Sequence, residues 1–354
     1  MQLGLESEYW VVDGEGRLTD GRPLLDAHER VEGEFVAPMI EVVTPPASGV
    51  EALEREFIEA LRAVLDAAER EGVHVVPLGT PLTADAMPAV TDRGRFLERL
   101  YGPGIDAAKH CAGTHVHFEK RNVVEQVNLL TALDPALALV SSSPYYEGER
   151  LAYCSRAYAY RRRTGAAFSR YRDLWEYMES LGEWNARLDG AYAELRTLAH
   201  ERGIDDATFE RYVRAENAVL TPVRLRFGSP TVEWRTPDTA LPSQVFRLVE
   251  EVERLVRRTE ELPLGIGDEP GVGDDAITIP PFAALEKLTR QAVFDGPADD
   301  VTAYLRSMGL EPSAYEPIAV ELSGPDRLDE SEASGLRLRY ADRLRRDVAE
   351  LSGR

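Results

Sequence analysis

Apolar and polar residues follow two different periods along this chain, and the two periods predict both strands and helices. Stretches that alternate every second residue between turn-forming residues are typical of strands. The predicted strands cover residues 3–12, 34–45, 73–77, 113–118, 223–227 and 231–236. Stretches with apolar residues three or four apart are typical of amphipathic helices. The predicted helices cover residues 93–101, 122–140, 243–261, 281–293, 297–308 and 329–352, with more helix between 170 and 217.

Helices separate most of the predicted strands, which indicates an α+β fold with a mixed, largely antiparallel sheet and a helical C-terminal region. A capping box at residues 48–51 would begin a further long helix that ends near Gly72. Pro135 is expected to disturb the helix that begins at Asn122. Residues 265–275 are rich in glycine and acidic side chains, and we expect them to form an exposed loop.

Two of the predicted strands carry paired polar side chains. Residues two apart in a strand point to the same face, so His115 and His117 would lie side by side, and so would Glu6 and Glu8. Neighbouring carboxylates repel each other unless a cation lies between them or one is protonated. A His-x-His pair alone more often has no special role than it binds a metal. Its weight as an indication of a metal site therefore depends on the other polar pairs.

Two further segments add to this pattern. Glu233 and Arg235 would share a face, either as a surface ion pair or as a metal ligand beside an anion-binding group. Glu41 lies in an apolar run, where a carboxylate is costly unless it is paired or bound to metal. Glu34 would point the opposite way in a regular strand, unless a bulge at Pro38 realigns it. Together the segments predict one sheet face lined with glutamate and histidine.

Composition narrows the class of protein. The 354 residues carry a net charge of −21, which disfavours binding to nucleic acid or to anionic membranes. Only three of the 41 basic residues are lysine, and this acidic, lysine-poor composition resembles that of proteins from salt-loving archaea. The two cysteines, Cys111 and Cys154, are expected to be reduced thiols. With no signal peptide or apolar span, the sequence predicts a soluble, cytoplasmic protein.

Arginines are concentrated between residues 150 and 172. They are Arg150, Arg156, Arg161, Arg162, Arg163, Arg170 and Arg172. Most are expected to pair with surface carboxylates, although guanidinium groups also bind phosphates and carboxylates in a bidentate manner. The chain has no Gly-x-x-x-x-Gly-Lys motif and no nucleophile elbow, so any bound ATP would not use a P-loop.

Six short motifs occur in an order that resembles the glutamate–cysteine ligase type 2 family, which includes the carboxylate–amine ligases. They are Gly4-Leu-Glu-Ser-Glu8, Glu41-Val-Val-Thr-Pro45, Gly113-Thr-His-Val-His117, Ser143-Pro-x-x-x-Gly148, Ser155-Arg156 and Thr231-Val-Glu-Trp-Arg235. The resemblance covers roughly residues 1–250. Two details depart from the family pattern. Phe118-Glu119 follows the histidine pair where Val-Gly is common, and Ser142 stands where asparagine is common.

The resemblance implies a glutamine synthetase-like fold, in which a curved, mainly antiparallel sheet forms a funnel for ATP and magnesium. Residues 1–260 would form this catalytic domain, and residues 261–354 a helical extension packed on it. The implied reaction joins the γ-carboxylate of glutamate to the amine of cysteine through γ-glutamyl phosphate. Its product, γ-glutamylcysteine, belongs to glutathione biosynthesis. The partners would be small molecules only, and the chain could form a homo-oligomer.

The resemblance also assigns roles to residues. Mg²⁺, with Mn²⁺ as a substitute, would be held by Glu6, Glu8, Glu41, Glu233 and His115, with His117 as a second nitrogen ligand or a phosphate contact. Glu34 would be a further ligand. Arg235 would stabilise the transferring phosphoryl group beside Glu233, and Arg156 would bind the glutamate α-carboxylate. Arg163 and Arg226 are weaker candidates for substrate binding.

Three other functions remain open at this point. The acceptor could be an amine other than cysteine, because acceptor pockets are built from loops. A metallohydrolase could also use a His-x-His pair, but the excess of carboxylates over histidines disfavours zinc. A non-catalytic metal or nucleotide binder would not require Arg235.

We expect the melting temperature to rise with KCl concentration, because salt screens repulsion among the many surface carboxylates. Thermal unfolding followed by circular dichroism from low to molar KCl measures this. Sucrose is the control, because it favours the compact state without screening charge. A melting temperature that does not change with KCl would contradict the expectation.

Overall fold

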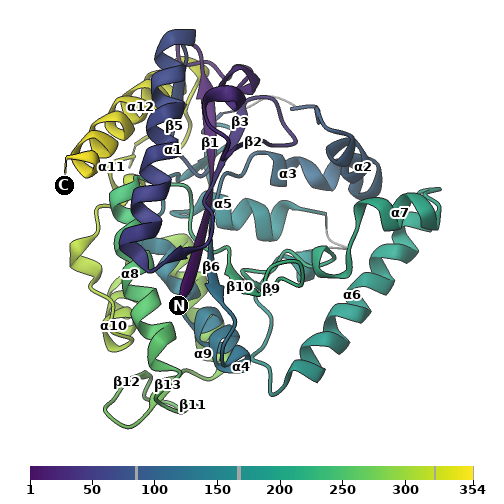
Figure 1. The fold of residues 1–354 in the computed structure, drawn as a ribbon, viewed down its shortest axis with the longest axis vertical. Helices are drawn as coiled ribbons and strands as arrows, with labels where there is room; N and C mark the ends of the chain where they lie inside the picture. The colour runs from purple at the N-terminus through teal and green to yellow at the C-terminus, as the bar shows by residue number, and fades with distance from the viewer. Residues whose placement is uncertain (84–86, 166–168, 323, 354) are drawn as a thin grey trace.

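A computed structural model gives the fold of residues 1–83, 87–165, 169–322 and 324–353 (Figure 1). Its main sheet has the strand order β2-β3-β1-β6-β10-β9, with β4 and β5 also paired to β1. The pairings in this sheet are antiparallel. Its strands are β1 (Gln2–Val12), β2 (Val31–Gly33), β3 (Met39–Val43), β4 (Ala47–Ser48), β5 (His74–Val76), β6 (Thr114–Glu119), β9 (Val223–Leu225) and β10 (Thr231–Trp234).

The long strand β1 shows how the sheet separates an apolar face from a polar one. Leu3 and Leu5 are buried on one face, whereas Glu6 and Glu8 project from the other. Helices α1 (Val50–Glu71), α8 (Pro242–Arg258) and α12 (Glu330–Ser352) pack together, and α1 and α12 contact the sheet. Figure 1 shows the three helices on one side of β1. The polar face is therefore free to carry a functional site.

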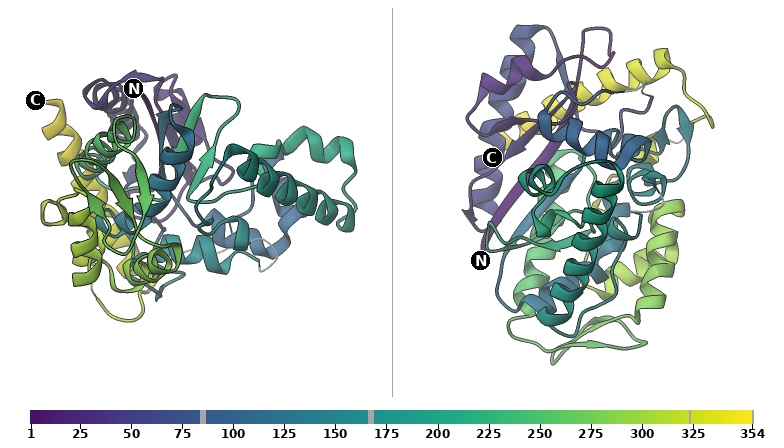
Figure 2. Two further views of the ribbon diagram at one scale, coloured as in Figure 1. Left: turned by 90° about the horizontal axis from the view of Figure 1, so that it is seen from below. Right: turned by 90° about the vertical axis from the view of Figure 1, so that its right-hand side faces the viewer.

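A second group of helices lies on the other side of β1. Helices α2 (Asp92–Tyr101), α6 (Leu181–Glu201) and α7 (Asp206–Tyr212) share a separate hydrophobic cluster, and Figure 2 shows α6 and α7 extending away from the body of the molecule. The remaining helices are α3 (Asp106–Lys109), α4 (Val123–Ala132), α5 (Ser155–Tyr158), α9 (Phe282–Asp295), α10 (Asp299–Ser307) and α11 (Ile318–Glu321). A two-stranded sheet joins β7 (Tyr145–Tyr146) to β8 (Glu149–Arg150). Among the described helices, none has both the length and the apolar character needed to cross a membrane.

Most of the predicted elements are present. The long helix ends at Gly72, which adopts the left-handed conformation typical of a helix C-terminus. The helix that begins near Asn122 ends at Ala132 and continues as a 3₁₀ helix through Pro135, as expected. The hairpin of β9 and β10 is also confirmed.

Three local predictions were wrong. Ser48 does not cap α1, because Gly49 is its N-cap and provides no side chain for a capping hydrogen bond. Residues 34–45 are not one strand, because β2 and β3 form a hairpin and Glu34 lies in its connection. Residues 265–275 are not only loop. They belong to a small sheet of β11 (Leu264–Ile266), β12 (Gly271–Val272) and β13 (Ile277–Ile279).

Arg337 of α12 joins the C-terminal helix to loops from the first quarter of the chain. Its fully buried guanidinium group donates hydrogen bonds to the carbonyl oxygens of Pro81 at 2.8 Å, Gly16 at 3.1 Å and Thr83 at 2.7 Å. It also pairs with Glu330 at 2.6 Å. One arginine therefore satisfies carbonyl acceptors from two separate loops at once.

We expect Arg337→Leu to reduce the free energy of unfolding by about 3–5 kcal/mol, because buried carbonyl groups lose their donors. Arg339→Leu, two residues away, removes an exposed arginine whose ion pair with Glu321 spans 3.5 Å. That control should cost no more than about 1 kcal/mol. Urea unfolding of both variants at one KCl concentration measures the difference, and equal losses would contradict the role of Arg337.

Candidate functional site

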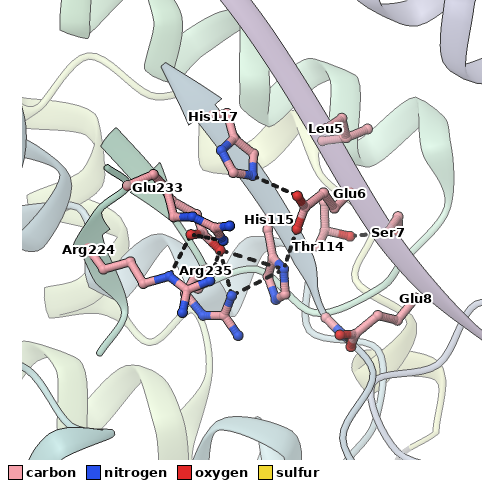
Figure 3. Close-up of polar contacts among 12 residues, drawn as sticks. Leu5, Glu6, Ser7, Glu8, Thr114, His115, His117, Arg224, Glu233 and Arg235 are labelled. Atoms are coloured by element: carbon pink, nitrogen blue, oxygen red, sulfur yellow. Dashed lines mark hydrogen bonds and ion pairs between the residues drawn. The ribbon is translucent and has the colours of Figure 1, made fainter. Parts of the chain in front are cut away.

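The two histidines of β6 lie beside a carboxylate of the neighbouring strand (Figure 3). The strand register places Glu6 of β1 opposite His115. One oxygen of Glu6 is 3.3 Å from Nδ1 of His115, and the other is 3.2 Å from Nε2 of His117. Burial by itself would raise the pKa of Glu6, but the hydrogen bonds with both imidazoles outweigh it and lower that pKa. The predicted histidine pair and Glu6 therefore meet on one face.

A group of three carboxylates lies next to this pair. Glu41 of β3 is opposite Glu8 of β1, and Glu34 reaches the same place from the β2–β3 connection. Carboxylate oxygens of the three side chains lie within 4.8 Å of one another. Burial raises the pKa of each carboxyl, and the neighbouring negative charges raise the pKa of Glu41 further. Such a cluster is stable only with bound protons or with a cation.

These side chains offer ligands for metal ions in three overlapping groups. One group is Glu8, Glu34 and Glu41, the second is Glu6, Glu41 and His115, and the third is Glu6, His117 and Glu233. Carboxylate oxygens outnumber imidazole nitrogens, and this set fits a hard cation such as Mg²⁺ better than zinc. The all-carboxylate group fits best, because none of the described cationic side chains forms an ion pair with it.

Glu233 differs from the three clustered carboxylates because arginines surround it. Its oxygens accept hydrogen bonds from Arg224 at 2.6 Å, Arg235 at 2.5 Å and Arg226 at 3.2 Å. Burial favours the neutral acid, but Arg224 and Arg235 outweigh it and hold the pKa of Glu233 well below its usual range. Glu233 therefore orients three guanidinium groups, and it could bind a metal only if some of them moved away.

Arg156 reaches the same face from α5. Its Nη1 is 3.3 Å from the carbonyl oxygen of Thr236, and its buried Nε has no hydrogen-bond partner within the described residues. A β-carbon on Gly113 would lie only 1.9 Å from Nη2 of Arg156. The Gly113 amide also donates to Glu8 at 2.6 Å. The glycine before the histidine pair therefore makes room for the arginine and fixes a carboxylate.

Four arginines enclose a cavity beside these groups. Arg156, Arg161, Arg172 and Arg235 line it, and its volume of about 20 Å³ has room for little more than one water molecule. Arg161 is neutralised by Asp134, to which it donates two hydrogen bonds of 2.7 Å. Arg235 shares the single carboxylate of Glu233 with Arg224 and Arg226, so positive charge remains at this side of the cavity and suits an anionic group.

Asp238 lies behind Arg156 and is almost fully buried. Its carboxylate accepts a 3.0 Å hydrogen bond from the amide of Ser142 and is 3.8 Å from Nη1 of Arg156. Burial raises the pKa of Asp238 to about 6, although Arg156 and Ser142 oppose the shift. The arginine is thus positioned by an acid that titrates near neutral pH.

The structure brings most of the predicted site residues together, but Arg163 lies elsewhere. It contacts Glu147 at 3.9 Å and lies over the ring of Tyr146. Sequence reasoning did not include Arg224 or Asp238. The alternation from Val223 to Phe227 could have revealed Arg224, because it places Arg224 on the same hairpin face as Glu233. No local pattern distinguishes Asp238.

Comparison with known proteins identifies the family. Residues 2–240 match glutamate-cysteine ligase family 2 (GCS2), and the chain belongs to this family. The match ends before α8 and therefore excludes the C-terminal helices, but it includes the sheet and all of the site residues described above.

Individual relatives are distant. A protein from Haloquadratum walsbyi named glutamate–cysteine ligase is 27% identical over 277 residues, which cover 72% of this chain and 69% of the relative. A protein from Salinispora tropica, provisionally named glutamate–cysteine ligase 2, is 28% identical over 169 residues. A similarly named protein from Rhodococcus jostii is 31% identical over 167 residues. The chain spans only 44–45% of the length of these last two relatives.

Solved structures share the fold. A glutamate–cysteine ligase from Francisella tularensis, solved in complex with AMP, has a TM-score of 0.52 at 13% identity and matches 99% of this chain and 91% of its own. A bifunctional glutathione synthetase from Pasteurella multocida has a TM-score of 0.52 at 15% identity and matches 99% of this chain and 52% of its own. The expected glutamine synthetase-like α+β fold is thereby confirmed.

We expect the stability contributed by Asp238 to fall as the pH rises from about 4 to about 6. In this interval the folded protein retains the proton, because its pKa is about 6, whereas the unfolded chain, with the ordinary value of 3.8, has lost it. Asp238→Asn should therefore gain roughly 2.5 kcal/mol relative to wild type between pH 4 and pH 7. Urea unfolding at both pH values measures the change. Asp26→Asn, which alters an exposed carboxylate, is the control. A wild-type-to-variant difference that is the same at both pH values would contradict the buried titration.

Proposed function

We propose that this protein is an ATP-dependent carboxylate–amine ligase that joins glutamate to cysteine and forms γ-glutamylcysteine. The observation that carries the proposal is the carboxylate group of Glu8, Glu34 and Glu41 beside an arginine-lined cavity, on one face of a family-matched sheet. ATP and glutamate are anions, so bringing them together requires divalent cations and positive side chains. The site supplies carboxylate ligands for the divalent cations, and its arginines are the positive side chains.

The nucleotide base belongs at the Glu6 and His117 end of the face. A cavity of about 200 Å³ lies there, between β1, β3, β6 and β10, and its lining is mostly apolar. Its lining includes Leu3, Gly4, Leu5, Val43, Pro46 and Thr231, together with Glu6 and His117. A planar base suits such a slot, and its phosphates would then extend toward the metal-binding carboxylates. The AMP complex of the Francisella relative supports a nucleotide substrate.

Glutamate belongs at the opposite, arginine-rich end. Arg156, whose Nε lacks a partner within the described residues, would bind the α-carboxylate, and Asp238 would hold Arg156 in place. The present cavity volume is too small for a carboxylate, so Arg156 and Arg235 must separate as the substrate enters. Arg235 would then stabilise negative charge on the transferring phosphoryl group. Glu233 keeps Arg235 oriented for this role.

The chemistry proceeds in two displacements. An oxygen of the glutamate γ-carboxylate attacks the terminal phosphorus of ATP, the bond to ADP breaks, and γ-glutamyl phosphate forms. The amine of the acceptor, having lost a proton, then attacks the γ-carbonyl carbon, and inorganic phosphate leaves. A bound Mg²⁺, or Mn²⁺ in its place, would neutralise phosphate charge during the first displacement. This chain's arginines orient the reacting groups throughout.

Cysteine as the acceptor is the finer part of the proposal and is supported by the names of the relatives. Another amine acceptor is the alternative, because acceptor pockets are built from loops. The mostly oxygen donor set disfavours the metallohydrolase, and the fixed Arg235 favours catalysis over simple nucleotide binding. We further propose that residues 1–260 form the catalytic unit and residues 261–354 a helical extension.

We expect ADP and phosphate release only when ATP, Mg²⁺, glutamate and an amine acceptor are all present. The assay is run in high KCl, with each component omitted in turn and with cysteine replaced by other amino acids. Release that requires glutamate but prefers another amine would retain the ligase and change the acceptor. Release that is independent of both amino acids would reject the ligase.

Glu41→Gln separates the metal role of the carboxylate group from its effect on the fold. Without metal the variant should be more stable than wild type, because the pKa of Glu41 is raised by burial and by neighbouring carboxylates. It should also lose at least about 90% of the activity and most of the Mg²⁺-induced rise in melting temperature. Glu59→Gln, on the exposed face of α1, is the matched control. A variant with full activity and an unchanged response to Mg²⁺ would show that the metal site lies elsewhere.

A further inference from the structure

A larger cavity lies between the α5 segment and α9, apart from the carboxylate face. Its volume of about 390 Å³ falls within the range of small-molecule sites, about 300–1,000 Å³. Tyr158 and Arg162 line it from one side, and Thr289, Arg290 and Phe294 line it from α9. Helix α9 lies beyond residue 240, where the family match ends, so the cavity combines a family segment with one outside the match.

The lining combines an aromatic edge with positive charge. The rings of Tyr158 and Phe294 meet edge to face with centroids 5.5 Å apart, and Phe294 is 47% exposed, so its ring is available to a ligand. Arg162 is already paired with Asp173 at 2.5 Å. Arg290, in contrast, is exposed, and none of the ion pairs among the described residues includes it. Glu286, one turn before Arg290 on α9, also lines the cavity, but it forms no ion pair with Arg290 among the described residues. The cavity therefore offers one cation outside any ion pair beside apolar rings.

Thr289 supplies a second, independent indication of a ligand. Its side chain is only 7% exposed, and its hydroxyl has no hydrogen-bond partner within the described part of the chain. Buried hydroxyl groups are rarely left without a partner, because losing water without a replacement costs free energy. In a helix this hydroxyl could bond to the preceding turn, yet here it does not. It remains available to a group that enters the cavity.

We propose that this cavity binds a small organic anion with an aromatic or other apolar body. Arg290 pairs with the anionic group, Thr289 donates a hydrogen bond to it, and the rings of Tyr158 and Phe294 contact the apolar body. The site is separate from the one proposed for ATP and glutamate and does not depend on that function. It shares Ala157 and Arg161 with the arginine-lined cavity, so its ligand contacts the segment that carries Arg156.

Titration of the full chain with 8-anilinonaphthalene-1-sulfonate tests the proposal, because this fluorescent probe is an aromatic anion. Three variants are compared with wild type at one KCl concentration, after thermal unfolding has shown that each is folded. Thr289→Trp fills the cavity, and Arg290→Glu reverses the charge of the proposed cation. Lys287→Glu makes the same change of charge at an exposed position of α9 that does not line the cavity.

We expect one saturable binding event in wild type and in Lys287→Glu. Arg290→Glu should bind the probe about tenfold more weakly, since a charge-assisted hydrogen bond is lost. Thr289→Trp should lose the saturable event. If the tryptophan variant does not fold, the comparison of Arg290→Glu with Lys287→Glu decides the matter. Equal affinity in these two variants, or no saturable binding to wild type, would overturn the proposal.

Discussion

Electrostatic repulsion among the carboxylates of one sheet face is the constraint on which the rest of the site depends. Neighbouring strands lie about 4.8 Å apart, so acidic side chains on adjacent strands cannot avoid one another. Glu6 escapes the difficulty because two imidazoles surround it. Glu8, Glu34 and Glu41 form no ion pair with a cationic side chain among the described residues, and burial makes their negative charges more costly. The fold tolerates this cost because the packed helices on the opposite face hold the strands together.

The positive half of the site solves the converse problem. Arg224, Arg226 and Arg235 would repel one another if the buried carboxylate of Glu233 were not between them. The arginines and the carboxylate group lie at different ends of the face, so one end is positively charged and the other is negatively charged. In the proposed function, an anionic substrate would contact cationic side chains at one end, and metal ions held by the carboxylates would contact it at the other. Neither half alone would bind two anions close enough to react.

The sequence was sufficient to predict the direction of a side chain where the alternation within one strand determines it. Alternation in β1, β6 and β10 placed Glu6, His115 and Glu233 on one face, because a strand leaves a side chain only two directions. It failed where the outcome depends on chain reversal, as for Glu34, which belongs to a hairpin connection rather than to a strand. It also failed for Asp238, since its importance comes from Arg156 and Ser142, which are distant in the sequence. Gly49 replaced the expected cap because a glycine with positive φ redirects the chain.

Gly113 shows how far a short motif can depend on the rest of the molecule. Its backbone does not have the positive φ that usually requires glycine, and the space of a side chain is instead occupied by a guanidinium group from α5. The present position of the Arg156 guanidinium group therefore depends on the missing side chain at residue 113. In a screen of random substitutions, changes at residues 113 and 156 should therefore have the same effect on the protein. A larger residue at 113 would displace the guanidinium group of Arg156 unless the arginine were shortened at the same time.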